Sequence, residues 1–497
     1  MFLPLVASSQ NMYNITNLLE KNPNGTARFV SMGGAMGALG GDLSVMGTNP
    51  AGTAIYRSSD FNLTGVLDIV KNSAEYEGTS MSAKYNGSGL NNLGFVIAIE
   101  TEESPVKFVN FGVNFRREAS FCDNFEMSGT AKVFSQQYVM DFLYRTTPFD
   151  VGKMTSDSYT GLEYNWLALL AADAGLCDID GNFLSKKGEP IFAPSELSYY
   201  GEQRGSHDVF DMNISTNIND VIYIGATVGY HKLDYSRYSC YKEKDELGDI
   251  YSLQNRYKLR GSGFDFKLGA IFRPFKYSPF KVAAYLHTPV FYKLTDVYSA
   301  SIDGPYEADD FFETTSDLCY GDDFYVSYSL KTAWKFGAAV SYTFGKFLAL
   351  NAEYEYDDIT AAKFTDGYDI DMAQNEEISR NLKAQHTIRL GAELSLGKFA
   401  LRAGYNYITS PFYKDAYKCI DNATIVDTST EYMNRFGKNV FTFGGGYAGK
   451  YLYFDIAYMC QKQNSDFYPF YDMDYINPAA TVSTVKQSIM AGIGIRF

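Results

Sequence analysis

Residues 335–344 alternate strictly between two kinds of side chain, and the same alternation recurs along most of the chain. A period of two places successive side chains on opposite faces of a β-strand, so one face of this run is apolar and the other is small or polar. At a tilt near 45°, a run of about ten residues crosses the roughly 25 Å apolar band that a membrane-spanning strand must cover. The apolar face consists of Phe336, Ala338, Val340, Tyr342 and Phe344.

The spacing of fourteen such runs predicts how they connect. The links after even-numbered runs are short and those after odd-numbered runs are long, with 119–205 the longest. Short turns on one side and long outer loops on the other are typical of bacterial barrels. We therefore expect an all-β, 14-stranded antiparallel transmembrane β-barrel over residues 59–497. The predicted strands are 60–69, 91–100, 107–118, 206–217, 220–233, 262–273, 279–291, 333–344, 346–358, 384–396, 398–409, 439–449, 451–462 and 486–497.

Composition and charge agree with this class and exclude others. Tyr (41), Phe (37) and Gly (43) are abundant, and no run of about 18 apolar residues predicts a membrane-spanning helix. The formal charge of −15 argues against nucleic acid as a partner. The alternative is a large soluble β-sandwich or propeller, whose strands are usually only about five or six residues long. The final apolar strand ends on Phe497, as in chains that present such a strand to the barrel assembly machinery.

The first 58 residues do not follow the strand pattern. Residues 1–9 are expected to be the remnant of an export signal, because a short apolar stretch precedes small residues. Residues 10–58 are rich in Gly, Ala and Met, which lets backbone segments pack closely. A barrel of this size without filling would enclose a wide aqueous lumen. We therefore predict an N-terminal plug, or hatch, over residues 10–58.

This N-terminal stretch resembles the hatch of the long-chain fatty acid transporter (FadL/TodX) family. A second likeness lies in 401–405 and the following Ser410-Pro411, and the acidic, tyrosine-rich style is similar to members from Bacteroidetes. The resemblance implies hatch and gating roles for Arg28, Gly33, Gly34, Asp42, Asn49, Pro50 and Ala51. The matching residues are Arg28, Gly33, Gly34, Ala35, Ala38, Asp42, Asn49, Pro50 and Ala51.

The resemblance also implies a function. A monomeric barrel in the bacterial outer membrane, in contact with its lipid and lipopolysaccharide, would pass small hydrophobic compounds such as long-chain fatty acids by passive, hatch-gated diffusion. Ligand would enter from outside, occupy an apolar interior and leave sideways into the membrane. No enzymatic activity and no cofactor are expected. A general porin for polar solutes and a surface adhesion barrel are the alternatives, and fatty acid, aromatic compound and haem remain open as cargo.

The longest loop carries the predicted ligand-docking residues. Helical spacing of apolar side chains within 131–144 and 159–176 predicts two loop helices that form an external docking site, or else pack on each other. No metal site is expected, because no CxxC motif occurs and only four His are present. The six cysteines, Cys122, Cys177, Cys240, Cys319, Cys419 and Cys460, leave disulfide pairing open. The docking residues are Val133, Tyr138, Leu162, Trp166 and Leu169.

Overall fold

The structure is a computed structural model of the 497-residue chain. The predicted remnant of the export signal, 1–9, lies outside the residues that it describes. The described residues are 12–101, 105–130, 135–155, 158–159, 162–183, 196–245, 248–304, 315–317, 324–366, 368, 370–372, 374–418, 420, 425–471 and 478–497.

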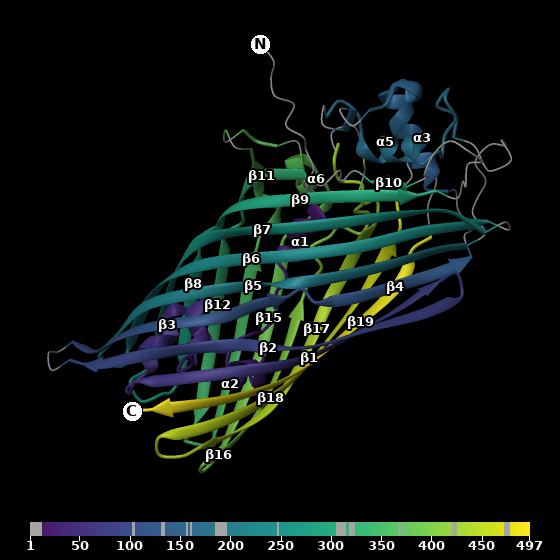
Figure 1. The fold of residues 1–497 in the computed structure, drawn as a ribbon. Helices are drawn as coiled ribbons and strands as arrows, with labels where there is room; N and C mark the ends of the chain where they lie inside the picture. The colour runs from purple at the N-terminus through teal and green to yellow at the C-terminus, as the bar shows by residue number, and fades with distance from the viewer. Residues whose placement is uncertain are drawn as a thin grey trace.

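One antiparallel sheet closes on itself as a barrel (Figure 1). Closure is made by the first and last strands, where Asp60 pairs with Arg496 and the register continues to Glu75 opposite Thr481. Closure removes the free edges that the first and last strands would otherwise present to lipid. The named strands are β1 (Asp60–Tyr76), β2 (Thr79–Glu100), β3 (Val106–Ser120), β4 (Asp123–Thr130), β5 (Glu196–Ile218), β6 (Ile222–Asp245), β7 (Gly248–Phe272), β8 (Lys281–His287), β9 (Phe291–Asp303), β10 (Thr315–Asp317), β11 (Phe324–Lys331), β12 (Lys335–Phe344), β13 (Leu348–Asp357), β14 (Lys363–Thr365), β15 (Gln385–Leu396), β16 (Phe399–Ile408), β17 (Tyr432–Ala448), β18 (Leu452–Tyr468) and β19 (Ala480–Arg496).

These segments make 14 barrel strands, because β3 with β4, β8 with β9, β10 and β11 with β12, and β13 with β14 each follow one another as interrupted parts of a single strand. All fourteen predicted strands have a counterpart, so the predicted fold class is confirmed. At the break between β8 and β9, Thr332 Oγ1 accepts from Val290 N at 2.8 Å. Side chains thus satisfy backbone groups that the broken ladder leaves free.

An apolar belt surrounds the outside of the barrel. On β7, Phe266 and Leu268 point outward and are 54% and 56% exposed, whereas the intervening Lys267 is buried inside. Outward apolar side chains of this kind occur on every side of the barrel, for example Phe95, Leu390 and Phe454. Among the described residues, no helix is long and apolar enough to cross a membrane. The belt is the surface that a barrel presents to lipid.

The strands are longer than predicted at the long-loop end of the barrel. β1 and β2 continue to a two-residue turn at Glu77-Gly78, where the sequence predicted a long loop between 69 and 91. The prediction of a long loop there was wrong. The cause of such errors can be seen on β7, where the outward Arg256 and Lys258 are exposed and the inward Tyr257 is buried. Above the belt the apolar face turns inward, so a search for an outward apolar face ended too early.

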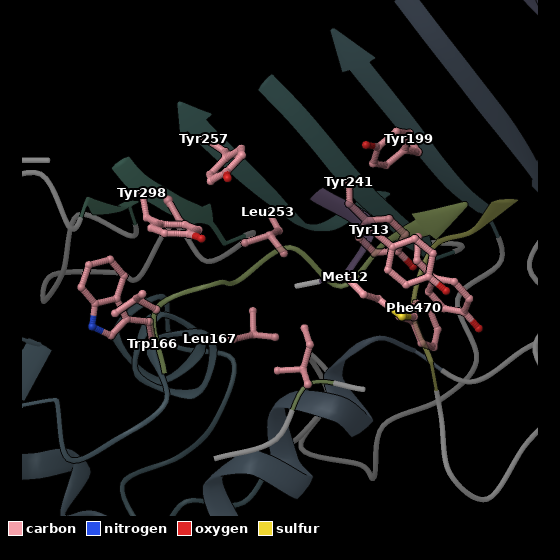
Figure 2. Close-up of a cluster of buried hydrophobic side chains, with 14 of the residues drawn as sticks. Met12, Tyr13, Trp166, Leu167, Tyr199, Tyr241, Leu253, Tyr257, Tyr298 and Phe470 are labelled. Atoms are coloured by element: carbon pink, nitrogen blue, oxygen red, sulfur yellow. The ribbon is translucent and has the colours of Figure 1, made fainter. Parts of the chain in front are cut away.

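Short helices fill or cap the two ends of the barrel. The longest loop places two of them side by side over the long-loop end. Figure 2 shows one buried hydrophobic cluster, into which side chains of α1, of α5 and the inward tyrosines of the strands all point. The helices are α1 (Met12–Leu18), α2 (Ala27–Ser31), η1 (Leu43–Gly47), η2 (Pro50–Ile55), α3 (Gln137–Thr146), η3 (Val151–Lys153), α5 (Trp166–Asp173), η4 (Ile359–Ala361) and α6 (Gln374–Asn381).

Candidate functional site

Within the N-terminal segment (residues 12–58), residues 27–56 pack against the inner face of the barrel wall. α2 contacts β16, β17, β18 and β19, whereas η1 and η2 contact β3, β5, β6 and β7 on another part of the wall. Gly37 N donates to Glu353 on β13 at 2.9 Å, which adds a contact from a third direction. Strands all around the sheet therefore contact this segment (Figure 1).

Two pairs of adjacent glycines on the barrel wall contact the segment. Gly225 and Gly269 are cross-strand neighbours on β6 and β7, and a Cβ at either position would collide with Asn49 or Pro50. Gly391 and Gly404 are neighbours on β15 and β16, where a Cβ would collide with the backbone of residues 32–33. The bare wall at both places permits backbone-to-backbone packing. The sequence predicted a small inner face here but did not reveal the glycine pairs as contact sites.

Arg28 ties α2 to the wall. Its guanidinium donates to both carboxylate oxygens of Glu393 at 3.0 and 3.2 Å and to Gly41 O at 2.7 Å. Glu393 also accepts from Arg402 at 2.6 Å, and Arg402 in turn donates to Asp455 at 2.6 Å. A two-point Arg–carboxylate bond fixes orientation as well as distance. This arrangement gives the predicted Arg28 a defined contact with the barrel.

The other predicted hatch residues shape the turns of the segment. Asp42 caps η1 by accepting from Ser44 N at 2.9 Å, and it also accepts from Thr26 Oγ1 at 2.7 Å. Asn49 caps η2 through Ala51 N and donates to Gly37 O at 2.6 Å. Gly33 and Gly34 have φ of 66° and 71°, a region that favours glycine. Pro50 is at the start of η2, where its missing N–H costs nothing.

Further polar contacts missed by the sequence analysis hold the segment. Lys21 bonds Glu355 at 2.9 Å and lies 3.3 Å from Asp357, both on β13. Lys438 on β17 donates to Glu20 at 3.0 Å. The segment is therefore held by ion pairs spread over β13, β15 and β17. Buried ion pairs of this kind specify position more than they add stability, and each is lost if one partner is removed.

The predicted docking residues of the longest loop lie in the cap. α5 is buried except for Asp173, with Trp166 5% and Leu169 0% exposed, and it packs against α3. Tyr138 is half-buried in α3, and Leu162 packs against the same cluster. Val133 lies outside the described residues. The two predicted helices thus pack on each other, and docking of ligand on these residues stays a prediction.

Tyrosines dominate the buried hydrophobic cluster at the long-loop end (Figure 2). Their hydroxyl groups bond to a few buried carboxylates: Asp296 accepts from Tyr257, Tyr298 and Tyr328 at 2.9, 3.0 and 3.1 Å. Asp296 is above the belt, and burial raises the pKa of its carboxyl group to about 7 against the lowering effect of these bonds. The cluster is thus an aromatic interior in which three tyrosine hydroxyl groups share one buried carboxylate.

A cavity of about 140 Å³ lies beneath this cluster. Aromatic side chains, including Tyr13 of α1, line part of it, and cations, amides and the carboxylates of Glu20, Asp123 and Glu431 line the rest. A cavity near 150 Å³ with apolar walls holds a benzene-sized molecule. The aromatic lining comes from Tyr13, Phe121, Phe125, Tyr199, Tyr432 and Phe467, and the cationic lining from Arg237, Arg435, Lys438 and Lys486.

The backbone hydrogen-bond ladder of the barrel wall is interrupted beside this cavity. The ladder between β2 and β3 ends at the pair Asn92–Arg116, and no residue of 79–91 pairs with β3 or β4, although both ranges are described throughout. β4 instead approaches the inward-facing Asn72 of β1, whose Nδ2 donates to Asn124 O at 2.7 Å. Within these described strands, side-chain bonds join β2 and β4, from Asn124 to Lys84 O at 3.4 Å and from Ser128 Oγ to Met81 Sδ at 3.0 Å. The stretch between residues 79–91 of β2 and β4, where no ladder forms, is here called the gap. Phe121 and other residues of the β3–β4 link line the cavity, so the cavity and the gap are adjacent.

Three of the four histidines meet on the inner wall. His207 Nε2 is 2.9 Å from His231 Nδ1, and His231 Nε2 is 3.1 Å from Asp265. His287 contacts Thr48 O of the N-terminal segment at 2.6 Å. The sequence indicated single histidines on separate strands and missed their meeting. Within the described part of the chain, no group of three His, Cys, Asp or Glu is placed to hold a metal ion.

The described cysteines Cys122, Cys177, Cys240 and Cys460 are free, whereas Cys319 and Cys419 lie outside the described residues.

No protein-family model matches the chain, and no curated protein matches it either. Solved structures do match. A FadL homologue from Pseudomonas aeruginosa superposes with a TM-score of 0.58 at 13% identity, covering 96% of this chain and 99% of that one. The chain has the FadL fold. The Pseudomonas putida toluene transporter TodX gives a TM-score of 0.51 at 11% identity, covering 96% of this chain and 99% of TodX.

A TodX monoaromatic hydrocarbon channel deltaS2 mutant also matches, with a TM-score of 0.51 at 12% identity, covering 95% of this chain and 98% of that one. The proteins that share the FadL fold with this chain are named as transporters and channels, not as enzymes. A closed barrel of 14 strands with an outward apolar belt belongs in the bacterial outer membrane.

Proposed function

We propose that this barrel carries small hydrophobic compounds across the outer membrane by passive diffusion, with the N-terminal segment as the hatch. The observation that carries the proposal is the 140 Å³ cavity beside the gap between β2 and β4. An apolar molecule entering from the long-loop end meets the aromatic cluster, then the cavity, then an opening in the wall. No energy source is needed, because each buried CH₂ favours apolar surroundings by about 0.8 kcal/mol.

The gap offers a sideways exit into lipid. Its lower end lies beside Leu67 of β1 and Leu90 of β2, which point outward and are 57% and 37% exposed in the belt. The inward positions Tyr85 and Gly89 are not buried, as expected for a strand without a neighbour on that side. A compound leaving here would pass from the cavity into hydrocarbon without crossing the polar short-turn end.

The cationic side of the cavity favours amphiphilic cargo with a carboxylate, such as a fatty acid. Arg237, Lys438 and Lys486 each have a carboxylate partner within 4.0 Å. The guanidinium of Arg435 makes no hydrogen bond or ion pair with any residue that the structure describes. We propose that Arg435 binds the carboxylate while the chain contacts the aromatic wall, since Arg suits carboxylate geometry.

A cross-link across the gap tests the exit. In a background with all native cysteines replaced by serine, cysteines at 84 and 124 joined by a short thiol-reactive linker should reduce fatty acid uptake at least about tenfold. The matched control joins cysteines at positions 73 and 82. These positions are opposite each other on β1 and β2, two strands that the ladder already connects. Equal uptake by both cross-linked proteins would rule out this exit.

The cargo class is tested separately. Arg435→Gln should lower uptake of a long-chain fatty acid by roughly tenfold and leave uptake of toluene unchanged, since a lost charged hydrogen bond is worth about 1.5–3 kcal/mol. Equal effects on both compounds would contradict a role for Arg435 in carboxylate binding but leave the route itself standing.

A further inference from the structure

A band of cations crosses the outer wall of the barrel just above the belt. Lys232 on β6, Arg260 on β7, Lys293 on β9 and Lys331 on β11 are all exposed. Each is the first charged outward residue past the apolar positions of its strand. Figure 1 shows β6, β7, β9 and β11 as neighbouring strands on one face. The four cations therefore form one continuous surface, here called the cationic band.

Strand register brings these side chains close together. Lys293 is opposite Ser262 on β7 and Ser329 on β11, so Arg260 and Lys331 are its diagonal neighbours. Diagonal neighbours on one face are about 7–8 Å apart at Cα, within reach of long side chains. Three cationic groups can therefore converge on one multivalent anion. Arg256 and Lys258 continue the same face of β7 upward.

Few carboxylates oppose this charge. Asp234 is opposite Arg260 at 3.6 Å, but the two side chains are 53% and 68% exposed, so water screens the pair. Asp208 is opposite Lys232 in the register but is bonded to Arg117 at 2.9 Å. The band thus keeps a local positive excess on a chain whose formal charge is −15.

A second, smaller group of exposed cations lies at this height on β1, β2 and β18, where Lys71 is opposite Lys84 and Lys462 is one strand beyond β19. At the first outward position past the belt, the strands on the other side carry an acid or an uncharged side chain at most positions. The examples are Asp358, His386, Thr409, Asn439 and Gln487. Cations at this height thus gather in two groups, and the group on β6, β7, β9 and β11 is the one above the opposed pair Phe264 and Phe291.

Aromatic side chains lie directly below the band. Phe264 on β7 is opposite Phe291 on β9, and they point outward with 50% and 53% exposure. We propose that the cationic band binds the phosphate groups of an anionic glycolipid of the outer leaflet, while its acyl chains lie on Phe264 and Phe291. Lys and Arg near a membrane surface each gain about 1 kcal/mol with anionic lipid, and the aromatic pair supplies the continuous apolar contact.

The proposal is tested with purified full-length protein in nanodiscs. Fluorescent diphosphoryl lipid A, at trace amounts in phosphatidylcholine, is the probe, and its retention by the protein is measured. The triple variant Arg260→Gln, Lys293→Gln and Lys331→Gln should bind it about a hundredfold more weakly, or about fivefold per cation removed. The matched control is Arg145→Gln, Lys153→Gln and Arg380→Gln, which removes three exposed cations from α3, η3 and α6, away from the outer wall, and should change retention less than twofold.

Equal loss of retention in both triple variants would overturn the proposal, as would equal retention of a dephosphorylated probe. Lys293→Arg should keep the binding, because it preserves the charge. A second arm adds inorganic phosphate to the wild-type protein. Complete displacement of the lipid at millimolar phosphate would identify a site for free phosphate and contradict a lipid site, whereas persistence of the lipid supports it.

Discussion

Arg28 of α2 and Glu393 of β15 join the N-terminal segment to the barrel wall through two parallel bonds of 3.0 and 3.2 Å. The side chains are 19% and 14% exposed, so the pair is largely removed from water. Glu393 is shared with Arg402, which leaves one carboxylate between two guanidinium groups. The pair therefore holds the segment in place. Removal of Arg28 would also change the balance of positive and negative charge around Glu393.

Arg28→Gln should loosen the segment without unfolding the barrel. Removing one partner of a largely buried ion pair costs up to about 3–5 kcal/mol, and partial exposure lowers this to roughly 1–3 kcal/mol. In planar bilayers we expect brief openings that the wild-type protein lacks. The control is Arg57→Gln, which breaks the exposed pair with Asp220 and should leave conductance unchanged. Silent traces from both variants would contradict a holding role for Arg28.

Gly404→Val should displace the segment by collision. A Cβ at Gly404 meets the backbone of Met32 and Gly33, which cannot rotate away as a side chain could. We expect proteolytic cleavage within 27–55 of the folded variant to become at least about tenfold faster than in the wild-type protein. Gly65→Val is the matched control, because Gly65 points outward and its nearest added contact is 3.8 Å away. Unchanged protection in Gly404→Val would argue against this packing.

Asp296 gives the extracellular half a pH dependence. Its pKa is about 7 in the folded protein and near 3.8 when unfolded, so unfolding releases a proton between pH 4 and 7. Stability should therefore fall as pH rises through this window, by at most about 1.4 kcal/mol per pH unit. Urea unfolding in detergent at pH 4.5 and 7.0 checks this, and Asp296→Asn should remove that part of the pH slope. The same slope in the variant and the wild type would show that another group is responsible.

The strand pattern predicted the barrel well because lipid imposes it. Every strand must present apolar side chains outward through the belt, so every second residue of the sequence there is apolar. The pattern failed where lipid ends. On β7 the outward Arg256 and Lys258 and the inward Tyr257 reverse the alternation, so residues 248–261 of the strand were assigned to a loop.

The site was predicted only in part. Arg28, Asp42 and Asn49 were expected from the resemblance to the FadL/TodX hatch, and each makes a capping or ion-pair contact in the structure. The glycine pair Gly391–Gly404 and the gap beyond Asn92 depend on which strands become neighbours and where a ladder stops. Such features arise from closure of the sheet, and no local pattern encodes them.

The account depends most on the N-terminal segment filling the lumen, and single-channel conductance tests this directly. Full-length protein and a variant lacking residues 10–58 are compared in planar bilayers, after heat-modifiable migration has shown that both barrels are folded. We expect little steady conductance from the full-length protein and large, steady openings from the deletion, because a 14-stranded barrel without filling encloses a wide aqueous lumen. Equal conductance from the two proteins would contradict the account.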